Sequence, residues 1–211
     1  MTGSKTNKQQ KSILNLRAIV TTAIMSAVAL ILMILEFSVP FVPSFIKFDF
    51  SDLPALITSF CFGPLYGIAV CLIKNLLHIP FGSSGGVGEL SNFILGAIFV
   101  GVAGLVYMLM KNRKGALIGS ISGSLAMALI QLVTNYYIVY PFYTNFMPMD
   151  AIIDAYALIF PFISNLWQAL LVVNLPFTLI KGLVASVICF LIYKKLSPIL
   201  KYAKKDRNLS K

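Results

Sequence analysis

The 211-residue sequence is poor in charged residues and contains a single histidine and three cysteines. Only 11% of its residues are charged, whereas 58% are hydrophobic and the mean hydropathy is +0.88. So few polar residues cannot cover a water-soluble domain of this size. The composition therefore excludes an ordinary soluble protein and indicates a membrane protein.

Motifs of several enzyme classes are also absent. Without a GxxxxGK[ST] loop, the chain cannot by itself bind and hydrolyse a nucleoside triphosphate. A lone His78 excludes paired-histidine metal motifs. Cys61, Cys71 and Cys189 lie in apolar segments and form no CxxC pair, which supports neither a disulfide framework nor a zinc site. We therefore expect neither an enzyme nor a bound cofactor or metal.

The formal net charge of +10 comes from basic residues that gather in short segments beside apolar runs. This placement favours membrane topology over nucleic-acid binding as its explanation, since basic residues are enriched on the cytoplasmic side of membrane proteins. We expect all three basic clusters to be cytoplasmic: Lys5, Lys8, Lys11 and Arg17; Lys111, Arg113 and Lys114; and Lys194, Lys195, Lys201, Lys204, Lys205 and Arg207.

The apolar runs set the number of membrane crossings. Four of them approach or exceed the roughly 20 residues that a spanning helix needs: 17–36, 89–110, 116–142 and 169–193. A fifth region, 51–81, contains Gly63-Pro64, which breaks a helix. If this region crosses once, the second and third basic clusters lie outside; if 51–62 and 64–80 each cross, all three lie inside.

The sequence therefore predicts an all-α membrane protein, a single bundle of six transmembrane helices with both termini cytoplasmic. We divide it into a polar N-terminal tail (1–15), a membrane domain (16–195) and a basic C-terminal tail (196–211). The helix before Gly63 has only about 12 residues and rises ~18 Å, so its neighbours must shield it. Short membrane helices often border binding sites.

Lys181 is the most informative polar residue. It lies about 12 residues from either end of the last apolar run, or ~18 Å, which is farther than a lysine side chain reaches. It must point into the protein, toward a carboxylate, carbonyls, water or a ligand; a buried ion pair is the structural alternative. Asn174 lies two helical turns earlier on the same face, although it could instead satisfy backbone groups freed by Pro176.

The stretch "QLVTNYYIVYPFY" begins at Gln131 and places Thr134 and Asn135 beside Tyr136 and other tyrosines. Aromatic walls with a few amide groups suit a flat heteroaromatic ligand. The alternative is a belt of interfacial tyrosines in which Asn135 bonds to another helix.

Other charged residues have simpler interpretations. Lys74 falls in the outer third of its helix and is expected to extend outward or to pair with Glu89. Asp49 and Asp52 flank the start of the helix at 51–62, where an acidic first turn favours the helix dipole, so we expect an architectural role.

His78 is expected to anchor a helix end at the outer surface. An intramembrane serine hydrolase would pair it with Ser83 or Ser84, but these residues are close neighbours across the Pro80 break. That geometry is unfavourable for a nucleophile and its base.

A small-residue motif, Ala23-x-x-x-Ala27, lies in the first apolar run. Small residues four apart let a second membrane helix approach closely, although the pattern is common.

Several segments together carry a family resemblance. They are "KFDFSDLPALITSFCFGPLYGIAVCLIKNLLH", "GSSGGVGELSNFILGAIF" and "NLPFTLIKGL". The chain from Ala18 to Tyr193 resembles the riboflavin-specific substrate-binding (S) components of energy-coupling factor (ECF) vitamin transporters, the RibU family.

This resemblance implies riboflavin capture from outside a bacterial cell membrane, in a pocket closed by the loop 37–50, which contains Phe45. Import would be powered by a membrane coupling (T) subunit and two cytoplasmic ATPases. The family's flavin-contacting asparagine and lysine match Asn135 and Lys181, and Asn174 matches a further motif position. Phe45 and Tyr136 complete the expected ligand-binding set, and the family's AxxxA contact with the coupling subunit matches Ala23 and Ala27.

We keep two other possibilities within transport. The ligand could be FMN, pantothenate or a pyrimidine precursor, because pockets differ on this fold. The chain could also work as a facilitator without partner subunits.

Overall fold

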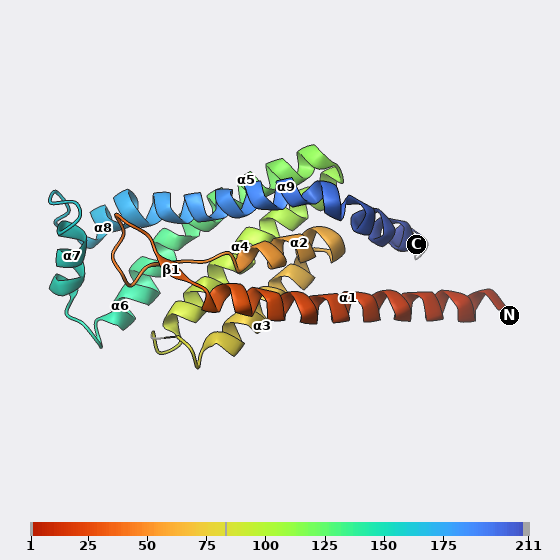
Figure 1. The fold of residues 1–211 in the computed structure, drawn as a ribbon, viewed down its shortest axis with the longest axis horizontal. Helices are drawn as coiled ribbons and strands as arrows, with labels where there is room; N and C mark the ends of the chain where they lie inside the picture. Colours follow the sequence, from red (N-terminus) through yellow and green to blue (C-terminus); the bar gives the residue numbers. More distant parts are fainter. Residues whose placement is uncertain (1, 83, 209–211) are drawn as a thin grey trace.

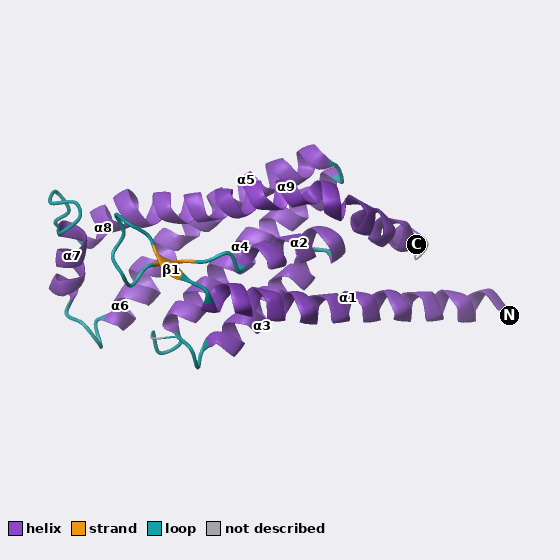
Figure 2. Cartoon of the chain, in the orientation of Figure 1, coloured by secondary structure: helices purple, strands orange, loops and turns teal. Residues whose placement is uncertain are grey.

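The computed structural model describes the backbone of residues 2–82 and 84–208 and the side chains of residues 16–82 and 84–192. It is 77% helical, as expected, with one short antiparallel pair of strands (Figures 1 and 2). The elements are α1 (Thr2–Ile34), β1 (Phe37–Ser38), β2 (Lys47–Phe48), α2 (Asp52–Phe62), α3 (Pro64–His78), α4 (Val87–Met110), α5 (Arg113–Thr134), the π-helix η1 (Asn135–Val139), α6 (Tyr140–Tyr143), α7 (Met149–Ala157), α8 (Leu166–Ala169), the π-helix η2 (Leu170–Asn174) and α9 (Leu175–Asn208).

The expected break at Gly63-Pro64 is confirmed, because α2 ends and α3 begins there. Gly63 has φ 113°, a region that side-chain-bearing residues rarely adopt, and its N–H donates to Ser59 O. Pro64 occupies the first helical turn of α3, where its missing N–H costs nothing. The two helices therefore fold back on each other and pack together.

Four helical stretches in the described chain are long and apolar enough to cross a membrane: 16–34, 87–110, 113–143 and 166–192. The shorter apolar helices α2 and α3 have 11 and 15 residues. The start of α1, the α4–α5 connection and the end of α9 lie toward the same end of the bundle, whereas α7 and α8 lie at the opposite end (Figure 1).

Two of these stretches contain a π-helical segment that was not predicted. Each segment ends two residues before a proline, Pro141 after η1 and Pro176 after η2. Proline lacks an N–H and its ring crowds the carbonyl four residues earlier, which favours a local widening of the helix. The widened segments begin at Asn135 and end at Asn174, so both candidate asparagines lie on irregular helix.

The helices pack closely around a core contributed mainly by α2, α3, α4, α5 and α9. A Cβ added to Gly123 of α5 would lie 2.5 Å from the carbonyl oxygen of Phe99, so only glycine allows this approach to α4. Ser59 of α2 donates to the Val100 carbonyl of α4 at 2.7 Å. Cys61, Cys71 and Cys189 are free and buried in this core.

The α1–α2 loop, residues 35–51, carries the strand pair, in which Ser38 lies opposite Lys47. Lys47 Nζ also donates to Ser38 Oγ at 2.8 Å. Helix α7 covers Met149–Ala157, and residues 158–165 are not helical. Tyr156 of α7 is fully buried, and it anchors this segment to a second apolar cluster around Tyr140 and Leu170.

Candidate ligand-binding site

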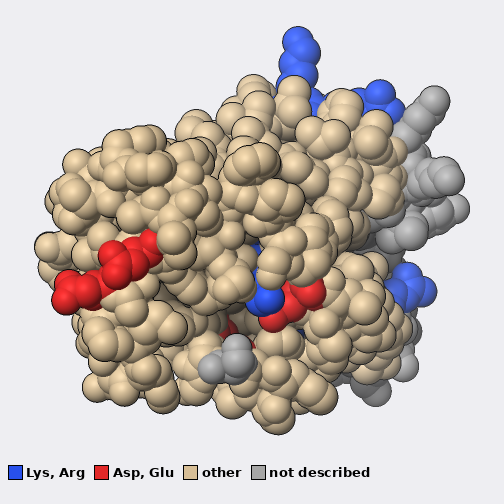
Figure 3. Space-filling model, turned by 60° about the vertical axis from the view of Figure 1, so that its left-hand side comes forward, with Lys and Arg blue, Asp and Glu red and all other residues tan. Residues whose placement is uncertain are grey.

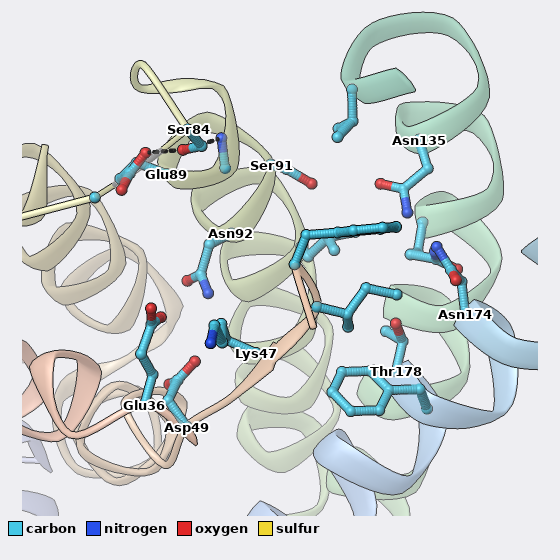
Figure 4. A pocket seen from close by; sticks show the side chains of 18 of the residues that line it. Glu36, Lys47, Asp49, Ser84, Glu89, Ser91, Asn92, Asn135, Asn174 and Thr178 are labelled. Atoms are coloured by element: carbon cyan, nitrogen blue, oxygen red, sulfur yellow. Dashed lines mark hydrogen bonds between the residues drawn. The ribbon is translucent and has the colours of Figure 1, made fainter. Parts of the chain in front are cut away.

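A cavity of about 660 Å³ lies among the α1–α2 loop, the start of α4, α5 with η1, and α9. Its size is in the range of sites for small organic ligands. Figure 3 shows a face made mostly of uncharged residues, with acidic and basic side chains beside a central hollow. In Figure 4, Asn135 and Asn174 lie on one side of the cavity, and Glu36, Lys47, Asp49 and Asn92 lie on the other.

A buried ionic network joins the α1–α2 loop to the helices. Lys181 Nζ of α9 donates to Asp49 Oδ2 at 2.7 Å and lies 4.0 Å from Asp52 Oδ2. Lys74 Nζ of α3 donates to Asp52 Oδ1 at 2.6 Å and to Ser51 Oγ. Ser51 in turn donates to Asp49 through its N–H and its hydroxyl. The network therefore ties the end of the loop to α2, α3 and α9.

Electrostatics hold Asp49 in its charged form. Burial raises the pKa of this carboxyl, but the positive charges of Lys181 and Lys74 outweigh it, so the pKa lies well below its usual range. Two lysines and two carboxylates balance in this network, which makes their burial tolerable.

This network corrects the interpretation of Lys74. The residue is fully buried and pairs with Asp52, so it neither extends outward nor pairs with Glu89. Lys181 points inward as expected, but it has a full counter-charge in Asp49. Ser51 occupies the N-cap position of α2 without a side-chain capping bond, because its hydroxyl bonds to Asp49. Asp49 and Asp52 also line the cavity, and each is held in an ion pair, with Lys181 and Lys74 respectively.

Glu89 pairs with His78 instead. His78 Nδ1 lies 3.0 Å from Glu89 Oε1, and Ser84 Oγ donates to Glu89 Oε2 at 2.8 Å. The contact anchors the end of α3 to the start of α4, in agreement with the expected anchoring role. Ser84 and His78 bond to different oxygens of one carboxylate, so this serine has no hydrogen bond to a histidine base. Ser83 lies outside the described residues.

The tyrosine-rich segment forms a second polar network. Asn174 Nδ2 donates to the hydroxyl oxygen of Tyr140 at 2.9 Å, and the Tyr156 hydroxyl donates to Asn174 Oδ1 at 2.7 Å. The two tyrosine hydroxyls also bond to each other. Asn174 is thus held between two phenols, and its amide positions Tyr140, which lines the cavity. Asn135, in contrast, makes no hydrogen bond from its amide to another described residue.

Four of the five expected ligand-binding residues line the cavity: Asn135, Asn174, Lys181 and Phe45. Tyr136 is not among the lining residues; its ring stacks on Trp167 with a centroid distance of 5.0 Å. Ala23 and Ala27 lie on an exposed face of α1 and take no part in the cavity. No group of three or more His, Cys, Asp or Glu side chains suited to a metal ion occurs in the described part of the chain.

Proteins similar to this chain are described as transporters or transporter components. Residues 17–193 match the family described as ECF transporter, substrate-specific component. The chain is 36% identical over 188 residues to riboflavin transporter FmnP of Bacillus subtilis (strain 168), covering 88% of this chain and 94% of that protein. It is 33% identical over 197 residues to riboflavin transporter RibU of Staphylococcus aureus (strain TCH60), covering 93% and 96%.

A solved structure is similar as well. The structure titled "Structure and mechanism of the S component of a bacterial ECF transporter" superposes with a TM-score of 0.71 at 31% identity, over 89% of this chain and 99% of that one. These relatives are bacterial transporters, and the long apolar helices make this chain a multi-pass membrane protein. The chain belongs to the family of substrate-specific components of ECF transporters.

Proposed function

We propose that this chain binds riboflavin in the cavity and delivers it for import driven by partner subunits. The observation that carries the proposal is a cavity of about 660 Å³ that combines aromatic walls with amides and with two lysines, Lys47 and Lys181. Relatives along nearly the whole chain are named riboflavin transporters.

Riboflavin is neutral and combines a flat ring, a hydrogen-bonding ring edge and a hydroxylated tail. Phe45, Phe177 and Tyr140 offer surfaces for the ring. The Lys181 ammonium has three donors and uses one on Asp49, so the others remain for ring or tail oxygens. Asn135 offers a free amide, whereas Asn174 acts through the phenols that it holds. Tyr136, stacked on Trp167, supports the aromatic wall from behind.

For topology, we propose six crossings with both termini cytoplasmic: α1, α2, α3, α4, the 113–143 stretch and the stretch beginning at residue 166. The start of α1, the α4–α5 connection and the end of α9 lie toward one end of the bundle, in agreement with cytoplasmic basic clusters (Figure 1). The polar tails 1–15 and 196–211 would then flank a membrane domain of residues 16–195. The cavity would open to the outside, beside the α1–α2 loop.

The energy must come from partners, because the chain has no nucleotide-binding loop. We propose that Ala23 and Ala27 form the contact with a membrane coupling subunit, which joins two cytoplasmic ATPases. Both alanines are exposed on α1, whose other face packs against α2 and α3. Small residues at this spacing suit close helix contact.

An absorption spectrum of the purified protein tests the proposed ligand. Co-purified flavin would be yellow, and added riboflavin would lose fluorescence on binding. Protein that shows neither effect overturns the proposal. Competition by FMN, pantothenate or a pyrimidine tests the other ligands, and uptake that persists without the coupling subunit would indicate a facilitator.

A further inference from the structure

Gln131 is a buried amide in the cavity wall whose oxygen has no hydrogen-bond partner among the described residues. The residue is 2% exposed and lines the cavity. Its Oε1 atom accepts no hydrogen bond from any residue that the structure describes. Buried side-chain acceptors normally accept a hydrogen bond, and a buried acceptor without one destabilises the protein. A partner is therefore expected from the contents of the cavity.

The position of Gln131 on its helix places its amide next to that of Asn135, one turn later on the same face. Met127, Gln131, Asn135 and Val139 follow each other at intervals of four residues, and all four line the cavity. They form one stripe that runs from α5 into η1. The two amides in the middle of the stripe are separated by about 6 Å of helix rise. Adjacent atoms on the edge of one flat ligand can contact both.

Two other acceptors of the cavity wall, the Asn174 amide oxygen and the Asp49 carboxylate, are already engaged. Asn174 uses both ends of its amide on Tyr140 and Tyr156. Asp49 accepts from Lys181 and Ser51. Gln131 Oε1 is thus an uncommitted neutral acceptor. The terminal torsion of a glutamine side chain is broad, so its amide can turn toward a ligand donor at little cost.

We propose that Gln131 Oε1 accepts a hydrogen bond from the imide N–H of the ligand's ring, while the Asn135 amide donates to a neighbouring carbonyl. The inference rests on the proposed function, because riboflavin carries one imide N–H between two carbonyl groups. Gln131 then determines specificity for the ring. A site with a buried acceptor rejects an analogue that lacks the matching donor, since the acceptor stays unpaired.

The test measures two ligands against two proteins, each in detergent by fluorescence quenching. The ligands are riboflavin and riboflavin methylated at the imide nitrogen, which removes the donor. The proteins are the wild type and Gln131→Met, which keeps the length of the side chain but lacks the acceptor. Wild type should prefer riboflavin by about 10-fold or more, and the variant should bind riboflavin about 10-fold more weakly with most of that preference lost.

Two further variants make the result interpretable. Gln168→Met changes a glutamine outside the cavity, and its affinities should equal those of the wild type. Gln131→Glu keeps an acceptor and should keep a preference for riboflavin, even where its affinity falls. Elution as a single species and the melting temperature establish that each variant is folded.

The outcomes separate the inference from the function on which it rests. Wild type that does not bind riboflavin overturns the proposed function. Wild type that binds riboflavin while folded Gln131→Met binds it equally well overturns the role of Gln131. So does a variant that loses affinity for both ligands by the same factor, because the lost contact would then involve the tail or the fold instead of the imide.

Discussion

The Lys181 ammonium donates to the Asp49 carboxylate across 2.7 Å, and thereby connects residues 132 positions apart in the chain. Lys181 lies in the middle of a membrane-spanning stretch, whereas Asp49 lies near the end of the α1–α2 loop. Both residues line the cavity. The contact places the Lys181 ammonium between the α1–α2 loop and the cavity. A substitution of Lys181 is therefore expected to affect both the position of the loop and the binding of the ligand.

Lys181→Met should weaken riboflavin binding by about 10- to 100-fold, the cost of losing a hydrogen bond from a charged donor. Membrane insertion should continue, because methionine is readily accommodated in a spanning helix. Fluorescence quenching by the purified variant measures the affinity. Lys114→Met, at an exposed site near the start of α5, is the control and should bind as the wild type does.

A double variant separates the two roles of Lys181. Lys181→Met alone leaves Asp49 without this counter-charge, so the melting temperature should fall. Adding Asp49→Asn removes the uncompensated charge and should recover much of the stability without restoring affinity. Recovery of the affinity in the double variant would mean that Lys181 acts only by holding Asp49.

The low pKa of Asp49 predicts how this contribution depends on pH. A carboxyl whose folded-state pKa is depressed stabilises the protein above its unfolded pKa of about 4, and the effect is lost as pH falls through the lower, folded value. The difference in melting temperature between wild type and Asp49→Asn should therefore stay constant from about pH 5 to 8 and shrink only below about pH 4. A difference that already shrinks between pH 7 and 5 would contradict the assignment of the charge to this pair.

The pair of Lys74 and Asp52 should matter more for stability than for ligand contact. Lys74 is fully buried, so Lys74→Met leaves Asp52 buried without this partner, a change that typically costs about 3–5 kcal/mol. Lys74→Met combined with Asp52→Asn should recover a large part of that loss. Unfolding of the purified variants in detergent measures both effects, and a single variant as stable as the wild type would refute the pairing.

Much of the helical layout could be predicted from the sequence. Gly63-Pro64 indicated a break because proline lacks an N–H and has a fixed φ, whereas glycine readily adopts the positive φ that ends a helix. Lys181 could be oriented inward because its side chain is too short to leave the membrane from that depth. These inferences depend on local geometry and chain length alone, and the structure agrees with both.

The ion-pair partners of the buried lysines were harder to predict from the sequence, because they depend on which helices lie side by side. The sequence predicted Glu89, the next carboxylate in the chain, as a partner of Lys74, but α3 packs on α2 and brings Asp52 to this lysine. A signal was available: Asp52 and Lys74 each lie 11 residues from Gly63, so a tight turn there aligns them. No comparable sequence pattern predicted the pairing of Asp49 with Lys181, because the two residues are far apart in the chain and no turn between them aligns the loop with the last helix.

The last prediction concerns coupling, and it separates binding from transport. Replacing Ala23 and Ala27 of α1 by leucine should leave riboflavin affinity unchanged, because both side chains are exposed and neither lines the cavity. The bulkier side chains should keep a partner helix from approaching, and ATP-driven uptake should fall to background. Co-purification with the coupling subunit and uptake in cells measure the two effects. Leu129→Phe, on an exposed face of α5, controls for added bulk toward lipid; uptake by the alanine variant equal to that of this control would rule out Ala23 and Ala27 as the contact.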